Sequence, residues 1–189
     1  MPSWSTFLKA HWDSMFATDL TTVEVWTRTG LVTFYVLAVM HLKTRRVHIV
    51  GITPSPNAVW LRQVCRNLTD TEDGFLKDAS HLIVDCDTSF IAMREFLAQN
   101  TETKVVLLPA KSPNLNAYME RWFRSLKSEC LDRMIFFRRK SLEDAVCEYV
   151  EHYHAESNHH GQRNERIEPG EDLGFSAGHI GYRERLGAC

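Results

Sequence analysis

The stretch Leu82-Ile83-Val84-Asp85-Cys86-Asp87 decides how the rest of the chain is interpreted. Apolar residues typical of a buried strand end abruptly there in two acids. A second apolar run, Val105 to Leu108, leads through a proline-rich turn into a helix that carries Glu120. Carboxylates at strand ends suit metal-assisted chemistry on phosphates, because Mg²⁺ prefers oxygen ligands and usually takes one or two carboxylates together with substrate phosphates.

The length and composition of the chain predict one main domain. Its 189 residues are 44% hydrophobic and 11% aromatic, which is enough for one sizeable core. A formal charge of −2 does not by itself indicate a nucleic-acid-binding protein. The segment from Lys111 to Lys140, however, holds eight basic residues and three acids, so it carries +5 and the remainder carries −7. We expect this segment either to bind a polyanion beside the acids or to form a solvated basic face.

The five cysteines predict a reducing environment. Their number is odd and no C-x-x-C pair occurs, which argues against a disulfide framework or a zinc ribbon. Histidines 152, 154, 159 and 160 crowd near Cys147, but no second cysteine stands at zinc-finger spacing. Neither a signal peptide nor an uninterrupted apolar stretch of about 18 residues is visible, so we expect a soluble, cytoplasmic protein.

The first half of the chain predicts a helix followed by neighbouring strands. Residues 1–13 have the apolar spacing of an amphipathic helix. Three β-rich segments follow, at 15–26, 32–42 and 46–53. The short turn between the last two favours a hairpin, and the three together favour an antiparallel meander. Ser55-Pro56 is typical of an N-cap followed by proline at the first position of a helix.

Further along, strands alternate with helices. A strand at 82–85 is followed by a helix near 90–97 and a strand at 105–108, an order that implies right-handed crossovers and parallel pairing. The whole pattern therefore predicts an α/β fold, a ribonuclease H-like mixed five-stranded sheet with three antiparallel strands, then two parallel ones, flanked by helices. We expect this core to occupy residues 14–156.

The helix after Ser112-Pro113 carries two different stripes. Its apolar stripe should bury against the sheet and consists of Leu115, Tyr118, Met119, Trp122, Phe123, Leu126 and Cys130. A second stripe, about 100° round the helix, consists of Asn116, Glu120, Arg124 and Lys127. One carboxylate, one amide and two cations thus project together. The alternative is that Glu120 and Arg124 form a surface salt bridge of a few tenths of a kcal/mol.

The last predicted helix has a capping-box-like start, with Ser141 and, three residues on, Asp144. Its apolar face runs from Leu142 to Tyr153. The chain is polar and rich in glycine after that point, so residues 157–189 are predicted to form a C-terminal tail.

The acidic motifs resemble those of the DDE integrase and transposase superfamily, found in retroviral integrases and bacterial insertion-sequence transposases. Thr18-Asp19-Leu20 in the first strand, Asp85 ending the fourth, and Ser-Pro-Asn-Leu-Asn-Ala-Tyr-Met-Glu-Arg at 112–121 match the three motifs in order. The 34 residues between Asp85 and Glu120 are close to the family's usual interval. Similar stretches at 125–131, 153–154 and 158–161 extend the resemblance over residues 14–165.

This resemblance implies a two-metal phosphoryl-transfer site in which Asp19, Asp85 and Glu120 hold Mg²⁺ or Mn²⁺ as ionised ligands. The implied reaction is DNA cleavage and strand transfer, as in DNA integration, transposition and recombination, without a covalent protein–DNA intermediate. The residues assigned to DNA binding are Asn116, Arg124, Lys127 and Lys111. We expect a homodimer or higher oligomer. Because only residues 1–13 precede the core, we also expect a separate subunit to recognise the DNA ends.

Several alternatives stay open at this point. Asp87 lies two residues from Asp85, on the same face of the strand by parity, although the spacing to Glu120 favours Asp85 as the ligand. The core could also be a non-catalytic DNA-binding or dimerising module, or a nuclease of ribonuclease H type that hydrolyses RNA in hybrids. Strand transfer to DNA by the purified protein would separate these functions.

Overall fold

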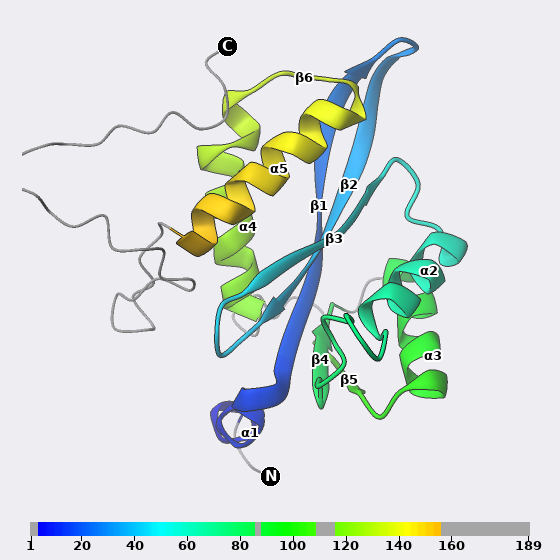
Figure 1. Ribbon diagram of the computed structural model, residues 1–189, viewed down its shortest axis with the longest axis vertical. Helices are drawn as coiled ribbons and strands as arrows, with labels where there is room; N and C mark the ends of the chain where they lie inside the picture. The colour runs from blue at the N-terminus through cyan, green and yellow to red at the C-terminus, as the bar shows by residue number, and fades with distance from the viewer. Residues whose placement is uncertain (1–3, 86–87, 109–115, 156–189) are drawn as a thin grey trace, which may run out of the picture.

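The structure is a computed structural model that describes residues 4–85, 88–108 and 116–155 (Figure 1). The strands are β1 Met15–Thr27, β2 Gly30–His41, β3 Val47–Thr53, β4 His81–Val84, β5 Lys104–Leu107 and β6 Phe136–Phe137. The helices are α1 Trp4–His11, α2 Ala58–Leu68, α3 Ile91–Asn100, α4 Ala117–Glu129 and α5 Arg138–Ala155. Short 3-10 turns cover Trp12–Ser14, Thr88–Phe90 and Leu131–Arg133.

The strands form one mixed sheet in the order β3-β2-β1-β4-β5, with β6 pairing with β1 outside this path. β1, β2 and β3 are antiparallel, whereas β4 runs parallel to β1 and β5 runs parallel to β4. This is the predicted ribonuclease H-like arrangement, which is therefore confirmed. The sequence did not predict β6, because two residues are too short to show a period of their own.

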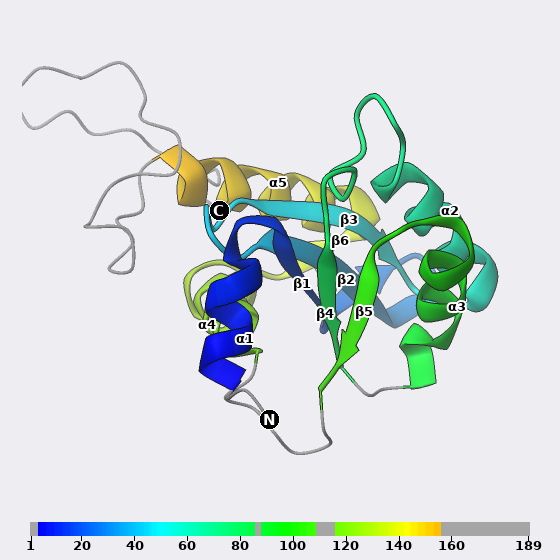
Figure 2. The same ribbon diagram turned by 90° about the horizontal axis from the view of Figure 1, so that it is seen from below.

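β1 divides its side chains between two hydrophobic cores, because successive residues of a strand point to opposite faces of the sheet. Met15, Ala17 and Val23 join one core, and Phe16 and Leu20 lie at the other. The first core is completed by α4 and α5, and the second by α2 and α3. Figure 2 shows these helix pairs on opposite sides of the sheet. Odd-numbered residues of β1 therefore face α4.

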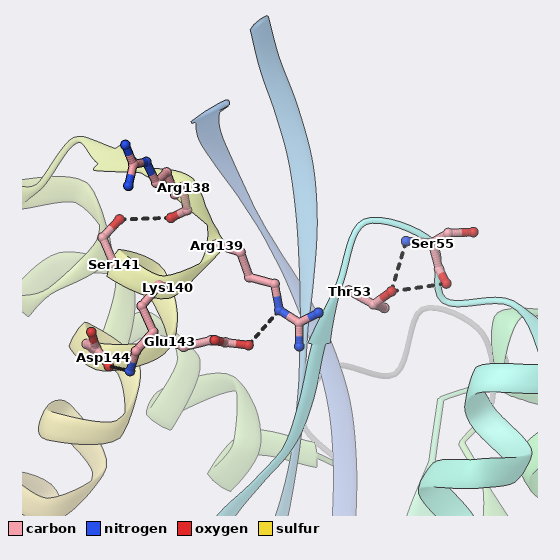
Figure 3. Close-up of polar contacts among 8 residues, drawn as sticks. All are labelled: Thr53, Ser55, Arg138, Arg139, Lys140, Ser141, Glu143 and Asp144. Carbon is pink, nitrogen blue, oxygen red and sulfur yellow. Dashed lines mark hydrogen bonds and ion pairs between the residues drawn. The ribbon is translucent and has the colours of Figure 1, made fainter. Parts of the chain in front are cut away.

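The start of α2 differs from the prediction. The N-cap is Asn57, whose side-chain oxygen accepts a hydrogen bond of 2.9 Å from the backbone N–H of Trp60. Ser55 instead belongs to a turn in which its backbone N–H donates to the Thr53 hydroxyl at 3.2 Å (Figure 3). That turn holds the predicted cap outside the helix, so α2 begins at Ala58.

The start of α5 was also predicted wrongly. The helix begins at Arg138, and Ser141 lies inside its first turn. The Ser141 hydroxyl donates to the carbonyls of Phe137 and Arg138, at 2.7 and 2.9 Å (Figure 3). A serine that bonds back to the preceding turn does not cap the N–H groups ahead of it. The predicted apolar face is nevertheless buried at Leu142, Ala145, Val146 and Tyr149.

The predicted apolar stripe of α4 is confirmed at five positions and wrong at one, and Leu115 lies outside the described residues. Met119, Trp122, Phe123, Leu126 and Cys130 are buried, whereas the predicted core residue Tyr118 is 37% exposed. The predicted turn at 109–114 and the tail at 157–189 lie outside the described residues. No helix in the described part of the chain is both long and apolar enough to cross a lipid bilayer.

Candidate active site

Asp19 lies in the middle of β1, on the face that α4 covers. It is partly buried, and its Oδ1 accepts a hydrogen bond of 2.7 Å from the backbone N–H of Leu20. The neighbouring Thr18 points the other way and donates its hydroxyl to the Ala38 carbonyl at 2.9 Å. β1 continues eight residues beyond Asp19, to Thr27, so the acid is held by paired strand on both sides rather than by a loop.

Asp85 is brought to Asp19 by strand register. β4 runs parallel to β1 with Ala17 opposite Ile83, and each acid comes two residues after its member of that pair. Ala17 and Ile83 belong to the same hydrophobic core, so the two acids continue the same face by parity. β4 ends at Val84, which leaves the Asp85 side chain exposed directly beyond the strand.

Glu120 comes to the same region from α4. It lies in the first turn of the helix and is partly buried. Met119 and Phe123, on either side of it, are buried in the core beneath the sheet and fix the rotation of the helix. Asp19 and Glu120 line one open cavity of about 490 Å³. Its other lining residues are Leu20, Thr21, Phe123, Arg124, Lys127, Ser128 and Asp132.

The electrostatics of Asp19 connect all three acids. The pKa of its carboxyl group is raised to about 6, first by burial and then by the negative charges of Asp85 and Glu120. The hydrogen bond from the Leu20 N–H and the positive charge of Lys127 oppose this rise. Like charges disfavour the ionised form of a neighbouring acid. The structure thus places the three predicted acids close enough for their charges to interact.

The donor chemistry of this cluster fits a hard divalent cation. Its three side chains offer only carboxylate oxygens, which are the preferred ligands of Mg²⁺. A cation would also relieve the mutual repulsion that raises the pKa of Asp19. Across residues 4–85, 88–108 and 116–155, no three His, Cys, Asp or Glu side chains are close enough to enclose one ion together. The acids form an open cluster in which substrate phosphates could complete the coordination.

The predicted DNA-binding residues are placed differently from one another. Arg124 is exposed and Lys127 partly buried, and both line the cavity beside Glu120. Asn116 is only 6% exposed, and its Oδ1 has no hydrogen-bond partner among the described atoms. Lys111 and the alternative ligand Asp87 lie outside the described residues.

Sequence reasoning missed Asp132 and the role of His41. Asp132 lines the cavity from the turn after α4, where no periodic pattern marks it. Nδ1 of His41 lies 2.9 Å from the Thr44 hydroxyl and accepts a bond of 3.1 Å from the Thr44 N–H. These bonds close the turn between β2 and β3, so His41 shapes the hairpin and lies outside the acidic cluster.

The fold and the acidic cluster together define a ribonuclease H-like core with a carboxylate site. Residues 101–165 match the family model described as the integrase core domain. This part of the chain is therefore similar to integrase core domains, and the predicted resemblance to integrases and transposases is confirmed.

One similar solved structure is a chain of the cryoEM structure of simian T-cell lymphotropic virus intasome in complex with PP2A regulatory subunit B56 gamma. The two chains share 13% sequence identity with a TM-score of 0.46, over 61% of this chain. The match spans 39% of the length of that chain. No curated protein sequence matches the chain.

Proposed function

We propose that this chain is the catalytic core of a DNA transposase or integrase that cleaves DNA and joins strands in a divalent-metal-dependent reaction. The observation that carries the proposal is the interaction of Asp19 with Asp85 and Glu120, which come from two neighbouring parallel strands and a helix. Integrase core domains generally use divalent metals, and a match to that family covers the segment that contains Glu120.

Asp19, Asp85 and Glu120 would hold two Mg²⁺ or Mn²⁺ ions. Bound there, the ions would supply Lewis-acid stabilisation of the charge that develops on phosphoryl oxygens. The residues of the chain keep three anionic groups at one place and orient them from rigid elements. Because the pKa of Asp19 is about 6, its carboxylate is mostly ionised and ready to act as a ligand at neutral pH.

Arg124 and Lys127 would bind the DNA backbone beside the acids, because they line the same cavity one and two turns beyond Glu120. Such phosphate contacts position DNA without reading its sequence. Asn116 and Lys111 are proposed to extend this contact toward the start of α4. The partners would be the ends of a mobile element and its target DNA, bound by a dimer or higher oligomer.

The direct test replaces Glu120 by Gln in an assay of DNA cleavage and strand transfer with Mg²⁺. Gln keeps the volume and helix propensity of Glu but lacks the anionic oxygen that a hard cation needs. The matched control is Glu129→Gln, on the exposed last turn of the same helix. We expect Glu120→Gln to abolish both reactions with folding and DNA binding intact, and Glu129→Gln to retain them.

Two outcomes would contradict this proposal. A Glu120→Gln protein that cuts and joins DNA at the parental rate would assign Glu120 to the helix surface. A parental protein that hydrolyses RNA in hybrids but does not join DNA would instead favour a nuclease of ribonuclease H type.

A further inference from the structure

Arg45 is a buried cation that packs against two aromatic rings from distant parts of the chain. The whole residue is only 8% exposed. The guanidinium carbon lies 3.4 Å from the centroid of the Tyr118 ring and 5.4 Å from that of Trp12. The two rings meet edge to face, 5.8 Å apart. We refer to Arg45, Trp12 and Tyr118 as the arginine clamp.

The backbone at Arg45 has a conformation that residues with long side chains rarely adopt. Its φ of 61° lies in the left-handed region, which glycine adopts readily and a long side chain rarely does. The turn is fixed by a bond of 2.9 Å from the Arg45 N–H to the His41 carbonyl. Nη1 of Arg45 donates to the Leu42 carbonyl at 2.5 Å. The guanidinium therefore bonds to the β2–β3 turn and contacts the two rings at the same time.

The clamp acts at the first turn of α4, which also carries Glu120. Asn116, at the N-cap position, makes no side-chain capping bond to the first turn. The N–H groups at the start of a helix have no partners inside the helix, so an uncapped first turn is held chiefly by its tertiary contacts. Tyr118 lies in that turn, and its contact with Arg45 ties the turn to the sheet.

We propose that Arg45 is a positioning residue for Glu120, which follows Tyr118 by two residues in the same turn. Arg45 is fixed to the hairpin that pairs with β1, and β1 carries Asp19. The clamp thus fixes the position of Glu120, on α4, relative to Asp19, on β1. A planar guanidinium on an aromatic face suits this task better than an ammonium, because it stacks as well as attracts. This inference rests on the proposed metal-dependent function.

The test uses four substitutions at the clamp and one control substitution, all in the full chain. Arg45→Gly removes the guanidinium and suits the left-handed backbone, and Arg45→Lys keeps only the charge. Tyr118→Leu removes the aromatic face, whereas Tyr118→Phe keeps it. Arg46→Met is the matched control, because Arg46 is the exposed neighbour in the same turn.

We expect Arg45→Gly and Tyr118→Leu each to lower kcat for DNA cleavage by about 10- to 100-fold, because small misplacements of a catalytic group are costly. KM for DNA should hardly change. The kcat of Arg45→Lys should fall between those of Arg45→Gly and the parent. The kcat values of Tyr118→Phe and Arg46→Met should equal that of the parent. The double variant should be no slower than either single one, because both remove one contact. Equal kcat in the Arg45→Gly, Tyr118→Leu and parental proteins would overturn the inference.

A second measurement does not depend on activity. Amide hydrogen exchange at residues 121–124 reports the first turn of α4, because these N–H groups donate to its carbonyls. Exchange there should accelerate in Arg45→Gly and Tyr118→Leu but stay at the parental rate for residues 126–129. Unchanged exchange would overturn the clamp. The exchange could be faster in the two variants while the parental protein neither cleaves DNA nor binds Mn²⁺. That result would support the clamp and reject the proposed function.

Discussion

Asp19 and Asp85 each come two residues after the parallel pair formed by Ala17 and Ile83, Asp19 within β1 and Asp85 directly beyond the end of β4. The parallel register thus leads both acids to one region, where the negative charge of Asp85 acts on Asp19. Glu120 adds a third negative charge from α4. Such a cluster costs folding free energy when no cation is bound, because like charges meet in a partly buried place.

This cost predicts that Asp19→Asn stabilises the metal-free protein at neutral and alkaline pH. The pKa of Asp19 is about 6 in the folded protein, against an ordinary aspartate value of 3.8. Between these values the folded state holds more protons than the unfolded state, so the stability contributed by this group falls as pH rises and stays low above pH 6. We expect Asn to raise the free energy of unfolding by roughly 1 to 3 kcal/mol at about pH 8 and to have little effect below about pH 4.

Urea unfolding with a chelator present would measure this effect. Asp132→Asn is the control, since Asp132 lines the same cavity but is exposed. Adding Mg²⁺ should stabilise the parental protein more than Asp19→Asn. Equal stability of the parent and Asp19→Asn across the pH range would show that the acids do not strain the site.

Arg124 and Lys127 are predicted to bind DNA through phosphates. Replacing both by Ala should weaken binding to unrelated sequences alike and reduce the slope of log K against log salt by about two units, one for each lost phosphate contact. Arg62→Ala with Arg66→Ala removes the same charge from the exposed side of α2, a helix on the opposite face of the sheet. An equal change of slope in both pairs would assign the effect to total charge.

Leu126 is predicted to be essential for stability, because its side chain is fully buried between α4 and the sheet. Leu126→Ala should lower the free energy of unfolding by about 2 to 5 kcal/mol through lost burial and the cavity left behind. Leu107→Ala, at a residue 39% exposed on β5, should cost much less. Denaturant titration of the two variants would compare them, and a similar loss in both would contradict the assigned packing of α4.

The sequence predicted the elements that have long, regular patterns. The β1 to β3 meander, the parallel β4 and β5, and the buried stripe of α4 all followed from apolar periodicity and turn residues. Errors fell at two serines that resemble helix caps. The Ser141 hydroxyl donates to the preceding backbone instead, and the Ser55 backbone N–H donates to the Thr53 hydroxyl in a turn outside the helix.

The sequence predicted the acids of the candidate site but not the residues that hold them in position. Asp19, Asp85 and Glu120 stood out because acids interrupt or end apolar elements at a familiar spacing. Arg45 did not, because a basic residue in a turn is ordinarily solvated, and its burial depends on Trp12 and Tyr118 meeting from distant segments. The sequence also predicts Tyr118 in the core. Its position on the helix does not distinguish a ring packed in the core from a ring that stacks on a cation.

A crystal structure of the protein with Mn²⁺ would test the central claim most directly, because the anomalous signal of manganese locates each bound ion. We predict manganese between the carboxylates of Asp19, Asp85 and Glu120, with two ions about 4 Å apart when a DNA end is bound. Glu120→Gln crystals should show reduced occupancy at that place. Manganese bound only elsewhere, or carboxylates that remain more than roughly 10 Å apart around the DNA end, would contradict a shared metal site.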